Sequence, residues 1–127
     1  MAEPVSLIVD DEPSIRAYIR EILHSQGIQS VEASNAIEAL KTLHKLGGQV
    51  DLLITDIQMP GDMDGLDLAY SAVNSFPSLP VILISGYSDK STGSFMFIRK
   101  PFVPAAILEV VNRVIMPRSR PASPGIP

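Results

Sequence analysis

Apolar residues along this chain fall into two alternating patterns. Short continuous runs of valine, isoleucine and leucine are typical of strands covered on both faces. Apolar residues spaced by three or four are typical of a helix with one buried face. The runs predict five strands, at residues 5–9, 28–33, 51–55, 80–85 and 95–99. A helical spacing follows each of the first three strands and the fifth.

Each predicted helix carries its apolar residues on one side. The first begins at Pro13, because a proline in the first turn loses no helical hydrogen bond, and the second ends at the glycine pair that starts with Gly47. The third, less regular in pattern, covers about residues 65–76, and the last covers about 103–116. The predicted core positions of the first, second and last helices are Ile15, Ile19, Ile22 and Leu23; Ile37, Leu40 and Leu43 or His44; and Ile107, Val110, Val111, Val114 and Ile115.

Strand and helix therefore alternate, which predicts an α/β fold with a doubly wound, five-stranded parallel sheet and helices on both of its sides. Two segments interrupt the alternation. Residues 88–94 have no apolar side chain and include a glycine, so we expect a loop or a single turn there, with the fourth helix shortened or absent. Residues 117–127 are rich in proline and serine, which predicts a flexible tail after one domain at residues 1–116.

The composition excludes several classes of function. The 127 residues carry a net charge of -4, without the basic excess that direct binding to nucleic acid needs. The absence of cysteine excludes disulfides, thiolate nucleophiles and cysteine zinc sites. No run approaches the ~18 apolar residues of a membrane span, and the N-terminus lacks the basic segment of a signal peptide. We therefore expect a cytoplasmic protein that does not contact a membrane.

Polar residues gather where the predicted strands end. Asp10 and Asp11 follow the first strand, Asp56 follows the third, Ser85 ends the fourth and Lys100 follows the fifth. Singly, each has an ordinary explanation, such as an N-cap, a turn residue or a side chain that faces water. In a doubly wound sheet, however, ligands bind beyond the carboxyl ends of the strands, near the point where the strand order reverses. We therefore expect these side chains to share one crevice.

Clustered carboxylates need a compensating cation. Two of them about 4 Å apart repel each other by ~4 kcal/mol at an effective dielectric constant of 20. Oxygen ligands without histidine or cysteine favour a hard ion such as Mg²⁺. With such a metal, Asp56 can act as a nucleophile in phosphoryl transfer, while Lys100 and Ser85 take the remaining phosphoryl oxygens. Glu12 or Asp11 remains a candidate cap of the first helix.

Four segments, "IVDDEP", "LLITDIQMPGDMDGLDL", "PVILISGY" and "FIRKPF", occur in this order in the chain. In them the chain resembles the receiver domain of bacterial two-component response regulators, over residues 5–116. The resemblance implies a flavodoxin-like sheet with the strand order 2-1-3-4-5. It also implies a phosphorelay protein that is not an enzyme beyond its own phosphorylation and dephosphorylation. Such a protein accepts a phosphoryl group from a histidine kinase or a histidine phosphotransfer protein, and signals to a downstream protein that the sequence does not name.

The resemblance also assigns a role to each acid. Asp56 would be the phosphoacceptor. Asp56 would also help to hold Mg²⁺ or Mn²⁺. Asp11 and the backbone carbonyl of Gln58 would bind the metal directly, and Asp10 would act through water. Gln58 and Tyr87, each two residues beyond a site residue, flank the path of an attacking water, so we expect them to tune the hydrolysis of the acyl phosphate.

The resemblance also implies that further residues respond to the phosphoryl group. Ser85 would be the switch hydroxyl, next to Gly86, and Lys100 would contact the phosphoryl oxygens, just before a cis Pro101. Phe97 would be the aromatic side chain that turns inward on activation. The fourth and fifth strands would rearrange around these residues.

The chain departs from the usual receiver pattern at two places. The "MPGDMDG" segment has one residue more than usual, and the spacing from Ser85 to Lys100 is several residues shorter, in agreement with the missing fourth helix. Receivers usually signal and dimerise through that helix, so we expect a monomer or a weak dimer. Similar abbreviated segments occur in stand-alone receivers and in hybrid kinases, and we expect no DNA-binding or enzymatic output domain to follow. We also expect residues 88–94 to be mobile and to become ordered on phosphorylation.

Other functions fit the sequence less well. A haloacid-dehalogenase-type phosphatase needs a second aspartate where Gln58 stands. A calcium loop with Gly65 at its sixth position would place Pro60 at its first ligand position. No GxGxxG segment follows the first strand, so dinucleotide binding has no support. The remaining alternative is a protein-interaction module with the receiver fold that switches without phosphate; such modules usually lose the phosphoacceptor, the acid pair or the lysine, all of which are present here.

Overall fold

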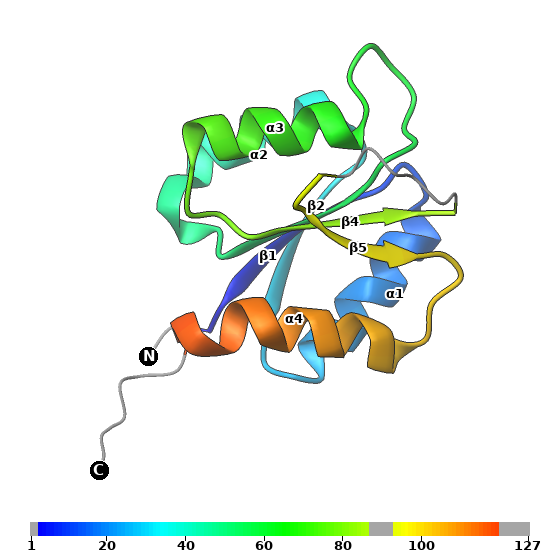
Figure 1. The fold of residues 1–127 in the computed structure, drawn as a ribbon, viewed down its shortest axis with the longest axis vertical. Coiled ribbons are helices and arrows are strands. Elements are labelled where there is room, and N and C mark those ends of the chain that lie inside the picture. The colour runs from blue at the N-terminus through cyan, green and yellow to red at the C-terminus, as the bar shows by residue number, and fades with distance from the viewer. Residues whose placement is uncertain (1–2, 87–92, 120–127) are drawn as a thin grey trace.

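The computed structural model describes residues 3–86 and 93–119, and within them strands and helices alternate as the sequence predicts (Figure 1). The strands are β1 (Val5–Val9), β2 (Gln29–Ala33), β3 (Leu52–Asp56), β4 (Val81–Ser85) and β5 (Met96–Arg99). The helices are α1 (Pro13–His24), α2 (Ala36–Leu46), α3 (Gly65–Ser75) and α4 (Pro104–Ser119), and a short 3-10 helix, η1 (Gly47–Gln49), follows α2.

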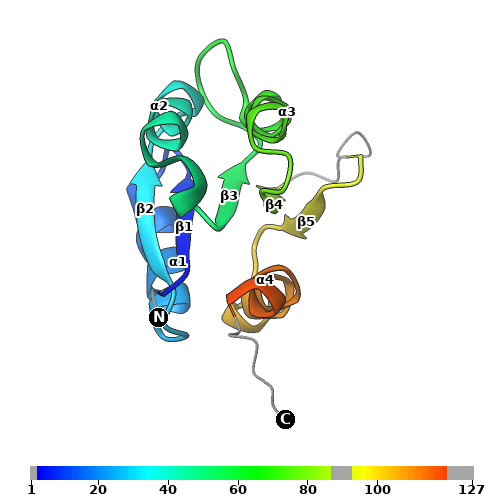
Figure 2. The ribbon, with the colours of Figure 1, turned by 90° about the vertical axis from the view of Figure 1, so that its left-hand side faces the viewer.

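The five strands form one parallel sheet in the order β2-β1-β3-β4-β5, which confirms the predicted fold class. Helices α2 and α3 cover one side of the sheet, and α1 and α4 cover the other (Figures 1 and 2). The strand order reverses at β1, because the chain passes from β2 across β1 to β3. The carboxyl ends of β1 and β3 therefore flank the place where this class of fold binds its ligands.

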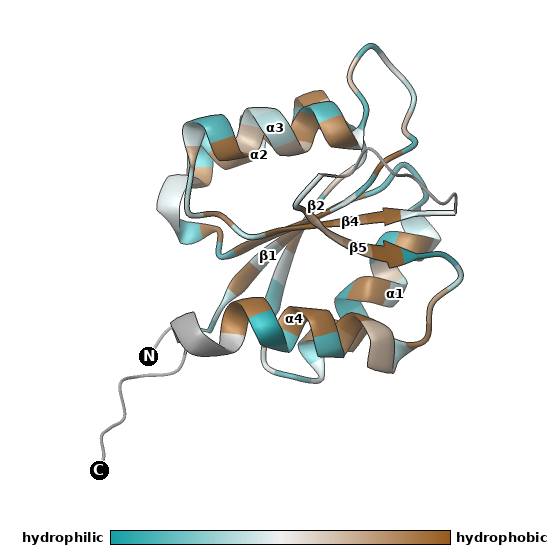
Figure 3. Ribbon diagram, in the orientation of Figure 1, coloured by the Kyte–Doolittle hydropathy of each residue, from teal (hydrophilic) through white to brown (hydrophobic). Residues whose placement is uncertain are grey.

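The two sides of the sheet carry separate apolar clusters. Leu7 and Leu53 belong to the cluster with α2 and α3, and Ile8 and Ile54 belong to the cluster with α1 and α4. Every residue of β3 and β4 is buried, which explains why β3 is apolar as far as Ile54 and β4 as far as Ile84. Figure 3 shows β4 mainly in brown and the helices in alternating brown and teal, as expected for strands between two layers of amphipathic helices.

Helix α2 buries a different face from the predicted one. Ala36, Ala39 and Leu43 are buried, and Leu40 is partly buried. Ile37 is 54% exposed, so its predicted core position is wrong. The alanines lie one and two turns before Leu43 and complete a single helical stripe with it; large residues alone do not reveal that stripe. In α1 and α4 the predicted positions are buried or partly buried, namely Ile15, Ile19, Ile22, Leu23, Ile107, Val110, Val111, Val114 and Ile115.

The ends of the elements follow the predicted signals with one difference. Pro13 is the first residue of α1, and Gly47 ends α2 with a positive φ of 57°, a conformation that favours glycine. Helix α4 continues through Pro117 to Ser119, beyond the predicted end at about residue 116. Pro117 has no N–H with which to continue the helical hydrogen bonds, yet the helix continues for two residues beyond it. The rest of the predicted tail, residues 120–127, lies outside the described residues.

The connection between β4 and β5 is short. Its described residues, Gly86 and 93–95, contain no helix. Most of the segment 88–94, for which we predict mobility, lies outside the described residues. Within the described parts of the chain, no helix is both long enough and apolar enough to cross a membrane.

Candidate functional site

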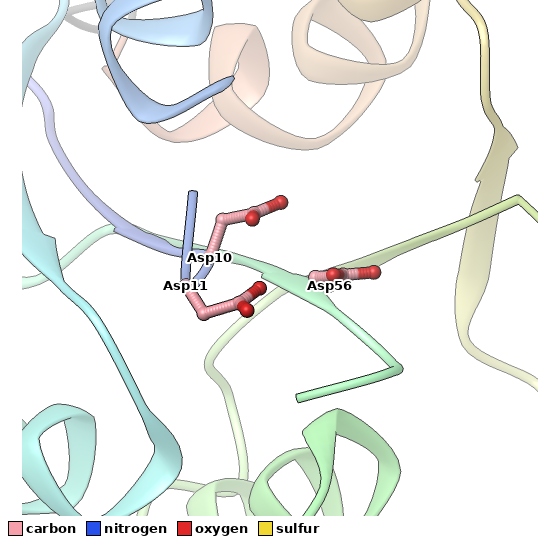
Figure 4. A group of neighbouring side chains, drawn as sticks. All are labelled: Asp10, Asp11 and Asp56. Carbon is pink, nitrogen blue, oxygen red and sulfur yellow. The ribbon is translucent and has the colours of Figure 1, made fainter. Parts of the chain in front are cut away.

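Three carboxylates meet beyond the carboxyl ends of β1 and β3. Asp10 and Asp11 are the first two residues after β1, and Asp56 is the last residue of β3. One carboxylate oxygen of each lies within 4.8 Å of the others. Figure 4 shows the three side chains projecting in the same direction from the ends of the two strands. The structure thus brings together the three acids that the sequence places at this edge.

The three acids differ in exposure. Asp10 is 1% exposed and Asp56 is 6% exposed, because each lies at the end of an interior strand of the sheet. Asp11, one residue further along the chain, is exposed. The site therefore has two buried carboxylates and one at its rim.

Lys100, the residue after β5, reaches both buried acids. Its ammonium Nζ lies 3.2 Å from Asp10 Oδ2 and 3.4 Å from Asp56 Oδ2. The backbone N–H of Lys100 donates to the carbonyl oxygen of Ser85 at 2.8 Å. This hydrogen bond holds the start of the segment that follows β5 against the end of β4. The peptide bond between Lys100 and Pro101 is cis, as the resemblance implies.

The electrostatics of the site follow from this arrangement. Burial and, after it, the Asp10 carboxylate raise the pKa of Asp56 from 3.8 to about 6, against the opposing effect of the Lys100 ammonium. For Lys100, burial lowers the pKa, but the Asp10 and Asp56 carboxylates outweigh burial, so the pKa lies above its ordinary value. Lys100 is therefore a cation throughout the physiological pH range, while Asp56 is ionised against the preference of its surroundings.

Asp10 is held by several hydrogen bonds. Its Oδ1 accepts from the backbone N–H of Glu12 at 2.9 Å, and its backbone carbonyl oxygen accepts from Nη1 of Arg16 at 2.7 Å. Glu12 occupies the N-cap position of α1, but its side chain makes no cap hydrogen bond. The side-chain capping role considered for Glu12 is therefore wrong. No hydrogen bond or ion pair joins the Asp11 side chain to another residue in the described ranges.

The predicted switch residues lie around the same edge. Ser85 is fully buried at the end of β4, and its hydroxyl donates to Oε1 of Gln58 at 2.8 Å. Gly86 is exposed beside it, and a Cβ added there would meet no atom within 4 Å. Phe97 is partly buried and packs against the cluster beneath α2 and α3. Tyr87 lies outside the described residues.

The donor set fits a hard divalent cation. Three carboxylates within 4.8 Å of one another are accompanied by one ammonium group, so an excess of negative charge remains among these groups. Asp11 also lines a surface hollow together with Gln58, whose backbone carbonyl we expect to be a ligand. Oxygen ligands of this kind are those that Mg²⁺ prefers, and the three aspartates are consistent with a Mg²⁺ site.

Two residues that contact the site do not stand out in the sequence. Arg16 in α1 donates to the Asp10 carbonyl oxygen, and the buried hydroxyl of Thr55 donates to the Asp56 carbonyl oxygen at 2.9 Å. An arginine in a first helical turn usually faces water, and a threonine is ordinary in a strand. Only the fold shows that both bind the backbone of site residues.

Comparison with known proteins identifies the family. Residues 6–112 match the response regulator receiver domain, so the chain belongs to that family. Among solved structures, the response regulator TrrA from Thermotoga maritima, in complex with Mg²⁺-BeF, is 33% identical with a TM-score of 0.80, over 88% of this chain and 99% of that one. The receiver domain of the hybrid histidine kinase CckA is 32% identical with a TM-score of 0.78, over 87% of this chain and 98% of that one.

Curated relatives place the same domain in longer proteins. The chain is 34% identical to part of the sensor kinase CckA from Brucella abortus and 33% identical to part of the transcriptional regulator NtrC from Escherichia coli K12, over 76% and 91% of its own length. It spans 11% and 25% of the lengths of these relatives. Receiver domains take phosphate from histidine kinases and are signalling modules rather than enzymes. The predicted family, fold and non-enzymatic class are therefore confirmed.

Proposed function

We propose that this protein is a phosphorelay receiver that accepts a phosphoryl group on Asp56 in a Mg²⁺-dependent reaction and changes conformation in response. The observation that carries the proposal is the buried carboxylate of Asp56 within 4.8 Å of the Asp10 and Asp11 carboxylates and 3.4 Å from the Lys100 ammonium. A nucleophile, a metal-binding acid pair and a cation for the phosphoryl oxygens are what phosphoryl transfer requires.

In the proposed metal site the acids would have separate roles. Asp11 is exposed at the rim and would bind Mg²⁺ directly, with Asp56 and the Gln58 backbone carbonyl. Both oxygens of Asp10 already accept hydrogen bonds, from the Glu12 N–H and from Lys100, which supports a less direct role through water. Bound Mg²⁺ would neutralise charge on the acids and on the phosphoryl oxygens.

The nucleophile is a carboxylate oxygen of Asp56. It attacks the phosphorus of a phosphorylated histidine on the donor protein, forming an acyl phosphate bond as the phosphorus–nitrogen bond breaks and the imidazole leaves. The fixed position of Asp56 at the end of β3 holds the carboxylate ready for in-line attack. Once Asp56 is phosphorylated, the Lys100 ammonium exchanges its carboxylate partner for a phosphoryl oxygen.

The response would begin at Ser85. Its hydroxyl now donates to the Gln58 side chain, and a phosphoryl group on Asp56 offers a charged acceptor that forms a stronger hydrogen bond. Movement of Ser85 toward that acceptor would release the Gln58 side chain and open space for Phe97 to turn inward. The donor would be a histidine kinase or a histidine phosphotransfer protein, and the signal would pass to a protein partner.

The test is phosphorylation by a small donor. The 127-residue protein is incubated with acetyl phosphate and MgCl₂, and its intact mass is measured with time. We expect the mass of one phosphoryl group to be added to the wild type, and none to be added to Asp56→Asn or in the presence of EDTA. A wild-type protein that takes up no phosphoryl group would instead favour the phosphate-independent interaction module. Uptake that survives Asp56→Asn would place the phosphoacceptor elsewhere.

A further inference from the structure

The backbone of Asp10 is tied to β2 on both sides. Its N–H donates to the carbonyl oxygen of Ala33 at the end of β2, at 3.2 Å. Its carbonyl oxygen accepts from Nη1 of Arg16 at 2.7 Å, and Nε of the same guanidinium donates to Oε1 of Glu32 in β2 at 2.9 Å. Arg16 therefore bridges the end of β1 to the edge strand of the sheet.

The Asp10 carbonyl oxygen belongs to the peptide unit that joins Asp10 to Asp11. A peptide unit is planar, so a hydrogen bond to its oxygen fixes the orientation of the whole unit and the starting point of the Asp11 side chain. Rotation of this unit would change the position of the Asp11 carboxylate relative to that of Asp10. The separation of the two acids thus depends on a group outside the acidic cluster.

Arginine is suited to this contact. Arg16 uses two nitrogens of one rigid, planar group for two different acceptors, so the positions of Glu32 and of the Asp10 carbonyl oxygen are fixed relative to each other. The side chain is only 16% exposed, so water competes little for these hydrogen bonds. A lysine has a single nitrogen on a flexible chain and cannot hold both acceptors in this geometry.

We propose that Arg16 is a positioning residue for the acidic site: it holds the Asp10–Asp11 peptide in the orientation in which both carboxylates share one divalent cation. The inference rests on the proposed metal site. Glu32 acts through Arg16 by fixing the guanidinium. Arg16 itself touches neither the metal nor the phosphoryl group; it acts through the backbone of Asp10.

The chain provides a matched control on the same helix. Arg20 also forms an ion pair with Glu32, but its side chain is 51% exposed and no hydrogen bond joins it to Asp10 among the described residues. Arg16→Met and Arg20→Met therefore both remove an ion pair with Glu32, and only the first removes the bond to the Asp10 carbonyl oxygen. Arg16→Lys retains the positive charge and tests whether the planar guanidinium, with its two donor nitrogens, is needed.

The experiment measures Mg²⁺ affinity by calorimetry, in parallel with urea unfolding and with phosphorylation by acetyl phosphate at several Mg²⁺ concentrations. We expect Arg16→Met to weaken Mg²⁺ binding by about 10- to 100-fold, the range typical for groups that orient metal ligands. Higher Mg²⁺ should restore much of its phosphorylation rate, and Arg16→Lys should recover little of the affinity. Arg20→Met should change the affinity by less than about twofold, because exposed ion pairs contribute little.

A merely structural role would lower the stability of Arg16→Met and leave its Mg²⁺ affinity unchanged. If Arg16→Met does not fold, Arg16→Lys is compared with Arg20→Met instead, and equal affinities in that pair would overturn the inference. If the wild type is phosphorylated and Arg16→Met binds Mg²⁺ with the same affinity as the wild type, this inference is overturned and the proposed function still stands. A wild type that neither binds Mg²⁺ nor takes up a phosphoryl group would overturn the proposed function and the inference with it.

Discussion

Asp56 is held in a position that disfavours its charge, and this has a measurable cost in stability. The residue is 6% exposed, and burial together with the Asp10 carboxylate raises its pKa from 3.8 to about 6. The substitution Asp56→Asn keeps the shape of the side chain and removes the charge. We therefore predict that Asp56→Asn is more stable than the wild type at neutral pH in the absence of divalent metal.

The magnitude follows from linkage. One pKa unit corresponds to about 1.4 kcal/mol, so a shift of about two units corresponds to about 3 kcal/mol at a pH above both values. We expect a gain of about 1–3 kcal/mol in the free energy of unfolding, and this net pKa shift already includes the loss of the ion pair with Lys100. Since the folded-state pKa of Asp56 lies above the unfolded-state value, the folded wild type binds this proton more tightly. The loss of stability that the Asp56 charge causes in the wild type is therefore complete above pH 6, shrinks as the pH falls from about 6 to 4, and is absent below that.

The assay is urea unfolding followed by circular dichroism in EDTA, at pH values from 4 to 8. A parallel series in Mg²⁺ should narrow the difference, since a ligand at ten times its Kd stabilises the folded wild type by about 1.4 kcal/mol and the variant lacks the Asp56 ligand. Glu21→Gln, which removes a charge from the exposed face of α1, serves as the control and should show no comparable gain. An Asp56→Asn protein that is no more stable than the wild type at pH 7.5, or whose gain does not vary with pH, would refute the reasoning.

Two further predictions concern the site. Asp11→Ala should weaken Mg²⁺ binding by at least about tenfold, with a smaller loss in Asp10→Ala, when measured by calorimetry; unchanged affinity in Asp11→Ala would remove Asp11 as a direct ligand. Gln58→Ala and Tyr87→Ala should each change the lifetime of the phosphorylated protein several-fold, followed by intact mass after removal of the donor, and unchanged decay in both variants would contradict their role in hydrolysis.

Much of the fold could be predicted because its interior strands consist mainly of apolar residues. The runs that end at Val9, Asp56 and Ser85 are covered on both faces, so their sequences carry a strong signal. The buried face of helix α2 is harder to predict. Ala36 and Ala39 bury little apolar surface yet define the face against the sheet, while the larger Ile37 is exposed. Side-chain size is not a measure of contact with the sheet.

The candidate site also has a part that the sequence predicts and a part that it does not. Asp10, Asp11, Asp56 and Lys100 could be placed together because parallel strands align their carboxyl ends at one edge. The contacts that orient them could not, because they depend on side-chain geometry between elements far apart in sequence. The bond from Arg16 to the backbone of Asp10 is one case, since nothing in the spacing of an arginine along a helix distinguishes a backbone contact from a solvated charge.

The position of the phosphoryl group on the chain tests the proposed function most directly. Wild-type protein treated with acetyl phosphate and Mg²⁺ is reduced with borohydride, which converts an aspartyl phosphate to homoserine, and its peptides are sequenced by tandem mass spectrometry. We expect homoserine at position 56 alone, and only in samples that contained a divalent cation. Homoserine at position 10 or 11, or none at any position, would contradict it.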